Sequence, residues 1–195
     1  NIKIQGDGTS TTAGNGGHMM TMDTSVVHAS GIELYLMGQK SLLGRYPFHW
    51  HLLGNAPGQY IKNSSIHDSF NRCVTVHGTN DTLVADNVCY NFIGHGYFLE
   101  DGYEERNVFD HNLGVLARKP RRCPTVDPNT FVFPAPFPCE AVPSPHLKDT
   151  DWRGGSASNG PAVFWIGHPN NTYTNNAAAG SGGTGFWYGM QDVVG

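Results

Sequence analysis

The sequence predicts an all-β fold, specifically a right-handed parallel β-helix with one proline-rich loop excursion. Segments in which apolar residues alternate with other residues recur at intervals of 26 and 23 residues: 48–51, 74–77 and 97–100. A second set recurs at 23 and 24 residues: 61–67, 84–90 and 108–114. Repeats of this length without a helical pattern are typical of solenoids, whose coils bury their apolar faces against one another. The 25 glycines and the 14% charged residues suit a fold with many tight corners.

Taken in order, the chain predicts strands of differing regularity. Residues 1–31 predict one or two irregular strands, 32–36 a clear strand, and 38–118 the regular coils. The period breaks at 118–160, which holds eight of the 12 prolines. Because proline cannot donate to a strand ladder, this segment is predicted to leave the solenoid as a loop insertion. The strands resume in two segments separated by a polar corner at 170–176: 162–166 and 185–188.

Length, net charge and the apolar runs restrict the kinds of protein that this sequence can form. The 195 residues are expected to form a single parallel β-helix domain, 1–195. A net charge of −4 provides no basic field for nucleic acid. No apolar run reaches the roughly 18 residues of a membrane span. The chain lacks a starting methionine and obvious caps, so we expect a piece of a longer protein. Its open ends would then meet further domains or neighbouring subunits.

Polar residues mark the corners between repeats. Aligning the second set of segments predicts one stacked column: Asn63, Asp86 and Asp110. The next column would contain Ser64, Asn87, His111 and Asn175. Such side chains tolerate a left-handed backbone and bond along the solenoid axis, so their expected role is structural. Three asparagines also fit the N-glycosylation pattern, which matters only in a eukaryotic source: Asn63, Asn80 and Asn170.

The four cysteines indicate an oxidising, extracellular location. Cys123 and Cys139 bracket part of the proline-rich insertion and are predicted to form a disulfide. A loop of that size would stabilise the fold by about 3 kcal/mol in the chain-entropy model. Cys73 and Cys89 fall on neighbouring coils, where they either pair or remain buried free thiols.

The candidate catalytic residues are His51, His77 and Glu100, which share one position in the first set of segments. Alternation places them on the outward face, about 4.8 Å apart from strand to strand. Glu100 would act as a general acid with an imidazole as its partner. Together with His49, the three can also hold a divalent metal, calcium or zinc. The alternative is a structural ladder in which histidine and glutamate only bond each other.

Three further residues near the starts of the same strands are candidate substrate contacts: Arg45, Arg72 and His95. A guanidinium binds a carboxylate in bidentate fashion, as an acidic sugar would require. The acidic turn at 100–105 is either a calcium site or a solvated turn.

Several long motifs also resemble one known family of β-helix proteins. They are 44–51, 65–78, 94–102, 110–114, 164–171 and 176–181. The family includes the cell-migration-inducing hyaluronan-binding protein and the transmembrane cell-surface hyaluronidase. Fibrocystin carries a related region, and bacterial and algal proteins carry the module. The likeness covers roughly residues 30–190.

This resemblance implies a right-handed parallel β-helix in an extracellular protein, secreted or at the cell surface, with hyaluronan as the expected acidic polysaccharide. Two members are linked to calcium-dependent hyaluronan depolymerisation, whereas fibrocystin resembles a receptor. Two hypotheses therefore stand side by side. The first is a module that binds or depolymerises an acidic polysaccharide; the second is a non-catalytic structural, adhesion or filament-forming solenoid. A metal or sugar bound at His49, His51, His77 and Glu100 would favour the first, and end-to-end stacking of chains would favour the second.

The disulfide prediction can be checked by peptide mapping. Without reductant, a proteolytic digest should contain one peptide pair joined through Cys123 and Cys139, which separates when the digest is reduced. Recovery of both cysteines as free thiols would contradict the prediction and would weaken the extracellular assignment.

Overall fold

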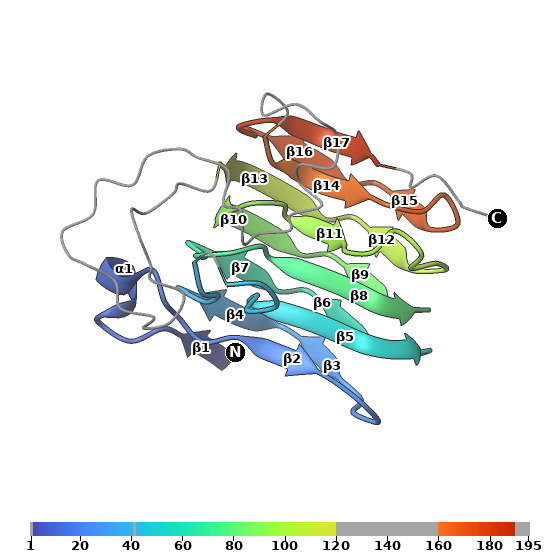
Figure 1. Ribbon diagram of the computed structural model, residues 1–195, viewed down its shortest axis with the longest axis horizontal. Helices are drawn as coiled ribbons and strands as arrows, with labels where there is room; N and C mark the ends of the chain where they lie inside the picture. The colour runs from blue at the N-terminus through green and yellow to red at the C-terminus, as the bar shows by residue number, and fades with distance from the viewer. Residues whose placement is uncertain (1, 41, 120–159, 190–195) are drawn as a thin grey trace.

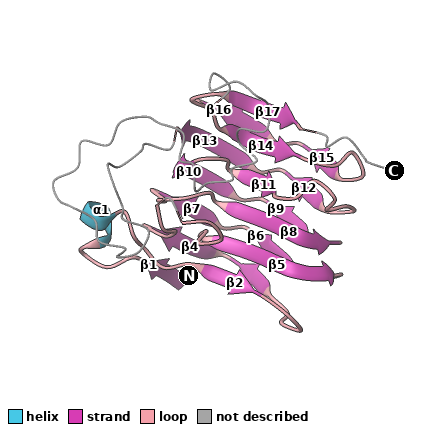
Figure 2. Cartoon of the chain, in the orientation of Figure 1, coloured by secondary structure: helices cyan, strands magenta, loops and turns pink. Residues whose placement is uncertain are grey.

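A computed structural model describes residues 2–40, 42–119 and 160–189, which form a parallel β-helix (Figure 1). Strands account for almost all of its regular structure (Figure 2). Every pairing between the named strands is parallel, and successive coils stack along one axis. The predicted all-β solenoid is therefore confirmed.

Each coil runs through three parallel sheets. Sheet 1 contains β1 (Ile2–Gln5), β4 (Ile32–Tyr35), β7 (Ser65–His67), β10 (Val88–Ile93), β13 (Leu113–Arg118) and β16 (Ala177–Ala179). Sheet 2 contains β2 (Met19–Thr21), β5 (Phe48–Asn55), β8 (Val74–Asn80), β11 (Tyr97–Leu99), β14 (Ala162–Ile166) and β17 (Thr184–Tyr188). Sheet 3 contains β3 (His28–Ser30), β6 (Tyr60–Lys62), β9 (Leu83–Ala85), β12 (Val108–Asp110) and β15 (Thr172–Thr174).

Two segments are more regular than predicted. Residues 1–31 contribute three strands and a short helix, α1 (Ser10–Ala13), instead of one or two irregular strands. The polar corner at 170–176 contains the strand β15, because Thr172–Thr174 pairs with β12. Short polar strands of this kind lack the apolar alternation that would reveal them in a sequence.

On sheet 2, the side chains predicted to face the core do so, and those predicted to face outward lie on the other side. The side chains expected to face inward are at most 1% exposed and belong to one hydrophobic core: Phe48, Trp50, Val74, Val76, Tyr97 and Leu99. His51 lies opposite His77 in the register of β5 and β8. The backbone N–H of Glu100 donates to the carbonyl of Val76, so Glu100 continues the same column. Histidines and glutamate are thus on the outer face.

The corner columns between sheets 3 and 1 need one correction. Asn63 and Asp86 stack as predicted, but Asp110 does not follow them, because it lies opposite Ala85. His111 occupies that corner instead, and Asn175 follows it. All four corner residues have positive φ: Asn63 49°, Asp86 56°, His111 54° and Asn175 55°.

The reason for the error is an ambiguity in β12. Phe109, not Val108, is the core residue opposite Val84, so the repeat between β9 and β12 is 25 residues. Val108 has the same side chain as Val84, whereas Phe109 does not, so the sequence repeat aligns Val108 with Val84 and is shifted by one residue from the structural register. The neighbouring column consequently continues through Asn112 and Asn176 rather than His111 and Asn175.

This second column is a buried asparagine ladder. The Oδ1 atom of Asn112 accepts hydrogen bonds from the backbone N–H of Asn87 at 3.1 Å and from its Nδ2 at 3.0 Å. Asn112 Nδ2 donates to the carbonyl of Val84 at 2.8 Å. In the next coil, the Oδ1 atom of Asn176 accepts hydrogen bonds from the backbone N–H and the Nδ2 of Asn112. Asn87 and Asn112 are each 1% exposed, so the ladder satisfies backbone groups that water does not reach.

Among the described residues, the two longest connections between strands lie at the corner between sheets 1 and 2. The connections 6–18 and 36–47 join these two sheets, as does the segment between β13 and β14. That segment contains the predicted insertion, so the predicted Cys123–Cys139 disulfide falls outside the described residues. Cys73 and Cys89 are buried free thiols. In the described ranges, no helix is long and apolar enough to cross a membrane.

The asparagine ladder predicts a sharp stability contrast. Asn112→Ala should lower the free energy of unfolding by about 2–4 kcal/mol, because it leaves buried backbone groups of Asn87 and Val84 without partners. Asn175→Gly is the matched control. It removes an exposed corner amide, keeps the positive φ accessible, and should change stability by less than about 1 kcal/mol. If Asn112→Ala and Asn175→Gly unfolded at the same urea concentration, a structural role for the ladder would be contradicted.

Candidate active site on sheet 2

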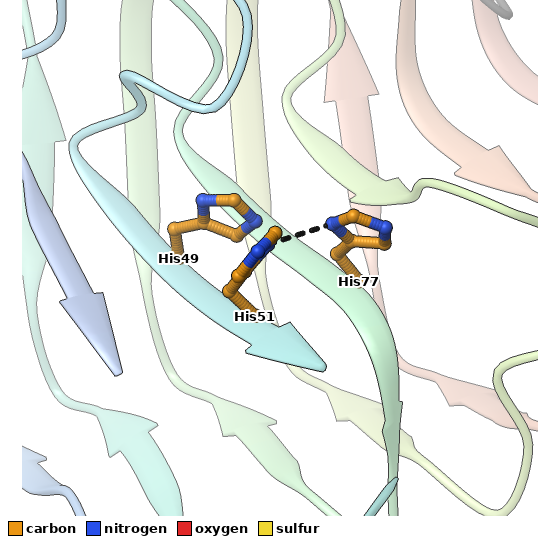
Figure 3. A group of neighbouring side chains, drawn as sticks. All are labelled: His49, His51 and His77. Carbon is orange, nitrogen blue, oxygen red and sulfur yellow. Dashed lines mark hydrogen bonds between the residues drawn. The ribbon is translucent and has the colours of Figure 1, made fainter. Parts of the chain in front are cut away.

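The candidate site is a group of three imidazoles on the outer face of sheet 2 (Figure 3). His49 and His51 come from β5, and His77 comes from β8. One nitrogen from each ring lies within 4.8 Å of the corresponding atoms of the other two. Alternation explains the arrangement, because residues two apart on β5 face the same side and the parallel register places His77 beside them.

His77 connects the group to solvent and to a carboxylate. Its Nδ1 lies 2.9 Å from Nδ1 of His51, and its Nε2 lies 2.9 Å from Oδ2 of Asp101. An Nε2–H that donates to Asp101 leaves the lone pair of Nδ1 directed at the centre of the group. The side chains of His77 and Asp101 are 19% and 34% exposed, so this edge of the site is accessible.

His49 forms the buried side of the group. Its Nδ1 lies 3.0 Å from the carbonyl of Gly44, whose φ of 76° turns the preceding loop toward β5. Donation to that carbonyl leaves Nε2 as the unprotonated nitrogen, and Nε2 is buried without a hydrogen-bond partner. Burial lowers the pKa of His49 to about 3, so the ring is neutral at physiological pH. Burial also lowers the pKa of His51, with the neighbouring His77 adding to the effect.

Glu100 lies between two of the imidazoles. Its Oε2 is 3.8 Å from Nε2 of His49 and 3.7 Å from Nδ1 of His77, and it has no hydrogen-bond partner. Its Oε1 accepts a hydrogen bond from the Tyr46 hydroxyl at 3.0 Å. The guanidinium of Arg72 in turn donates to the Tyr46 oxygen at 2.7 Å. This chain of bonds holds one carboxylate oxygen and leaves the other facing the histidines.

The three predicted substrate contacts are placed very differently. Arg45 is exposed and donates to Nε2 of His18 at 2.9 Å. Arg72 is 2% exposed, with its guanidinium 3.8 Å from the centre of the Phe98 ring. His95 is fully buried, and its Nδ1 accepts from the backbone N–H of Ala162. Direct contact with a glycan stays a prediction for all three, but only Arg45 presents its side chain at the surface.

The acidic turn after β11 is occupied by internal bonds. Glu104 is fully buried and accepts from the backbone N–H groups of Gly78, Asp101 and Gly102 at 2.8–3.0 Å. Burial nonetheless raises its pKa, since desolvation outweighs those bonds. Glu105 pairs with Arg106 and accepts from Asn170. These carboxylates shape the turn that presents Asp101, which does not favour a calcium site there.

Sequence reasoning missed two supporting residues. Tyr46 belongs to the motif 44–51, but its position before the strand gave no sign that its hydroxyl would reach Glu100. Asp101 was noticed only as part of an acidic turn, not as the partner of His77. Both contacts depend on loop conformation rather than on strand alternation, so the repeat pattern contains no signal for them.

Two of the predicted glycosylation sites lie at corners, and Asn80 is the last residue of β8. Asn63 and Asn170 are exposed, whereas Asn80 is half-buried. The Asn80 side chain accepts from the backbone N–H of Glu105 and donates to Asn55. Modification of any of the three stays a prediction, and the geometry favours Asn63 and Asn170.

Most of the chain is similar to known proteins. The family profile described as CEMIP beta-helix matches residues 14–194. The chain is 42% identical over 188 residues to human cell surface hyaluronidase CEMIP2, and 39% identical over 181 residues to mouse cell migration-inducing and hyaluronan-binding protein. Each alignment covers 89% of this chain. Mouse fibrocystin-L is 37% identical over 162 residues, or 83% of the chain.

These relatives are far longer proteins. The aligned region is 12% of the human protein, 13% of the mouse hyaluronan-binding protein and 3% of fibrocystin-L. The similarity therefore concerns the β-helix alone.

The Tyr46 hydroxyl predicts a measurable contribution to stability. Tyr46→Phe should lower the free energy of unfolding by about 1.5–3 kcal/mol, because bonds to the charged groups of Arg72 and Glu100 are lost. Tyr97→Phe is the matched control, since the Tyr97 hydroxyl donates only to the uncharged carbonyls of Asn87 and Leu113. Its expected cost is about 1 kcal/mol. A larger loss for Tyr97→Phe than for Tyr46→Phe would contradict the proposed bond chain.

Proposed function

The chain belongs to the CEMIP beta-helix family, and on that premise we propose that it is an extracellular module that binds and depolymerises an acidic polysaccharide such as hyaluronan. The names of two similar proteins support this direction, since one is a cell surface hyaluronidase and the other a hyaluronan-binding protein. The activity of a whole protein containing this module is part of the same proposal.

One observation carries the proposal. The Oε2 atom of Glu100 is buried without a hydrogen-bond partner and lies 3.7 Å from Nδ1 of the partly exposed His77. Most buried polar atoms in folded proteins are hydrogen-bonded, so this oxygen is a candidate for proton exchange with a ligand. The His77 imidazole would connect it to a group bound at the accessible edge.

The substrate would lie across the coils along sheet 2. Its scissile oxygen would approach His51 and His77, and Arg45 would contact a sugar carboxylate at the loop edge. Proton transfer would use Glu100 with the His77 imidazole, or a water held by a metal ion at the same side chains. Arg72 acts in this scheme through Tyr46 and Glu100, as a positioning residue rather than a substrate contact.

The second candidate is a non-catalytic structural, adhesion or filament-forming solenoid. The contacts of His51 with His77, and of His77 with Asp101, favour it, because a static polar ladder would form the same bonds. Binding of the polysaccharide without cleavage would be the expected behaviour in that case.

The decisive experiment measures hyaluronan chain length after incubation with the intact protein that contains this module. His77→Ala and Glu100→Gln should each slow depolymerisation by about 10²-fold or more, with the thermal midpoint nearly unchanged. His111→Ala, which removes an exposed corner imidazole bonded to Asp86, is the control and should keep the rate. Active wild-type protein with both site variants unaffected would refute the site assignment. Binding without cleavage by wild-type protein would favour the second candidate.

A further inference from the structure

The geometry points to a binding site for one divalent transition ion of the zinc class at His49, His51, His77 and Glu100. This inference stands apart from glycan cleavage, because it depends only on the three imidazoles of β5 and β8 and on the Glu100 carboxylate beside His49 and His77. It also differs from calcium, which prefers six to eight oxygen ligands.

The distances suit four-coordinate binding. Metal–nitrogen and metal–oxygen bonds of about 2.0–2.2 Å in a tetrahedron place ligand atoms about 3.3–3.6 Å apart. The nearest pairs here are 2.9 Å between His51 and His77, 3.7 Å between His77 and Glu100, and 3.8 Å between His49 and Glu100. The three histidine nitrogens lie within 4.8 Å of one another, so the side chains would draw together by up to about an ångström to surround one ion.

Two ligand atoms already lack other partners. Nε2 of His49 and Oε2 of Glu100 are both buried, face each other, and form no hydrogen bond. The His49 side chain is only 1% exposed. A buried nitrogen and oxygen left unpaired destabilise a fold, and a bound cation would satisfy both at once.

Supporting hydrogen bonds select the ligating form of two of the three rings. The carbonyl of Gly44 accepts the Nδ1 proton of His49, so Nε2 is free to ligate. Asp101 accepts the Nε2 proton of His77, so Nδ1 is free to ligate. An imidazole that ligates a metal through one nitrogen and donates to a carboxylate or carbonyl through the other is the usual arrangement in such sites. His51 joins them when its proton resides on Nε2.

The donor set determines the class of ion. Three imidazole nitrogens and one carboxylate oxygen suit zinc, cobalt and similar first-row ions, not magnesium or calcium. Glu100 is fixed by Tyr46 through its other oxygen, which keeps Oε2 directed inward as a ligand.

The test is metal binding by the full chain, measured without any glycan. Cobalt(II) titration should show the visible absorption of a four-coordinate ion, saturating at about one ion per chain. Zinc should displace cobalt, and millimolar calcium should not. His51→Ala and His77→Ala should each weaken cobalt binding at least about 100-fold. Asp101→Asn, which alters a supporting bond only, should weaken it about 10–100-fold.

His67→Ala is the matched control. His67 also contacts two carboxylates, Glu33 and Asp68 at 3.0 and 2.9 Å, but it lies on sheet 1 away from the cluster. This variant should bind cobalt like wild type, and circular dichroism should show that every variant is folded. Failure of folded wild-type protein to retain cobalt or zinc would overturn the inference, as would unchanged binding in His51→Ala and His77→Ala. Metal binding without glycan cleavage would refute only the proposed function.

Discussion

The parallel register between β5, β8 and β11 is the constraint on which the rest of the structure depends. Because side chains alternate, a slip of one residue would turn the histidine column into the core and expose Trp50 and its neighbours. Each large apolar side chain left exposed would cost about 1.5–3 kcal/mol. The burial of Trp50, Val76 and Leu99 therefore fixes where His51, His77 and Glu100 must lie.

The treatment of buried polar groups differs between the corners and the candidate site. In the asparagine ladder, amide atoms of Asn87 and Asn112 pair with each other and with backbone groups. At the site, Nε2 of His49 and Oε2 of Glu100 are buried without hydrogen bonds. Since unpaired buried groups destabilise a fold, this contrast supports the proposal that a ligand binds between His49 and Glu100.

The repeat pattern predicted most of the fold and the column at the centre of the site. It succeeded for His51, His77 and Glu100 because strand alternation and core burial are local consequences of sequence. It failed by one residue at Asp110, where Val108 and Phe109 are both apolar and only packing decides between them. It did not reveal the burial of Arg72 or the roles of Tyr46 and Asp101. Those depend on how loops fold over the coil.

The loops at the corner between sheets 1 and 2 are what make this solenoid asymmetric. A regular repeat would present the same outer face on every coil, whereas Tyr46 from the 36–47 connection reaches Arg72 and Glu100 on the next two coils. This chain of bonds orients one carboxylate oxygen toward His49 and His77. The same connection supplies the Gly44 carbonyl that sets the His49 tautomer. The strands thus place the candidate groups in a column, and the 36–47 connection and the turn that presents Asp101 determine which of their atoms face one another.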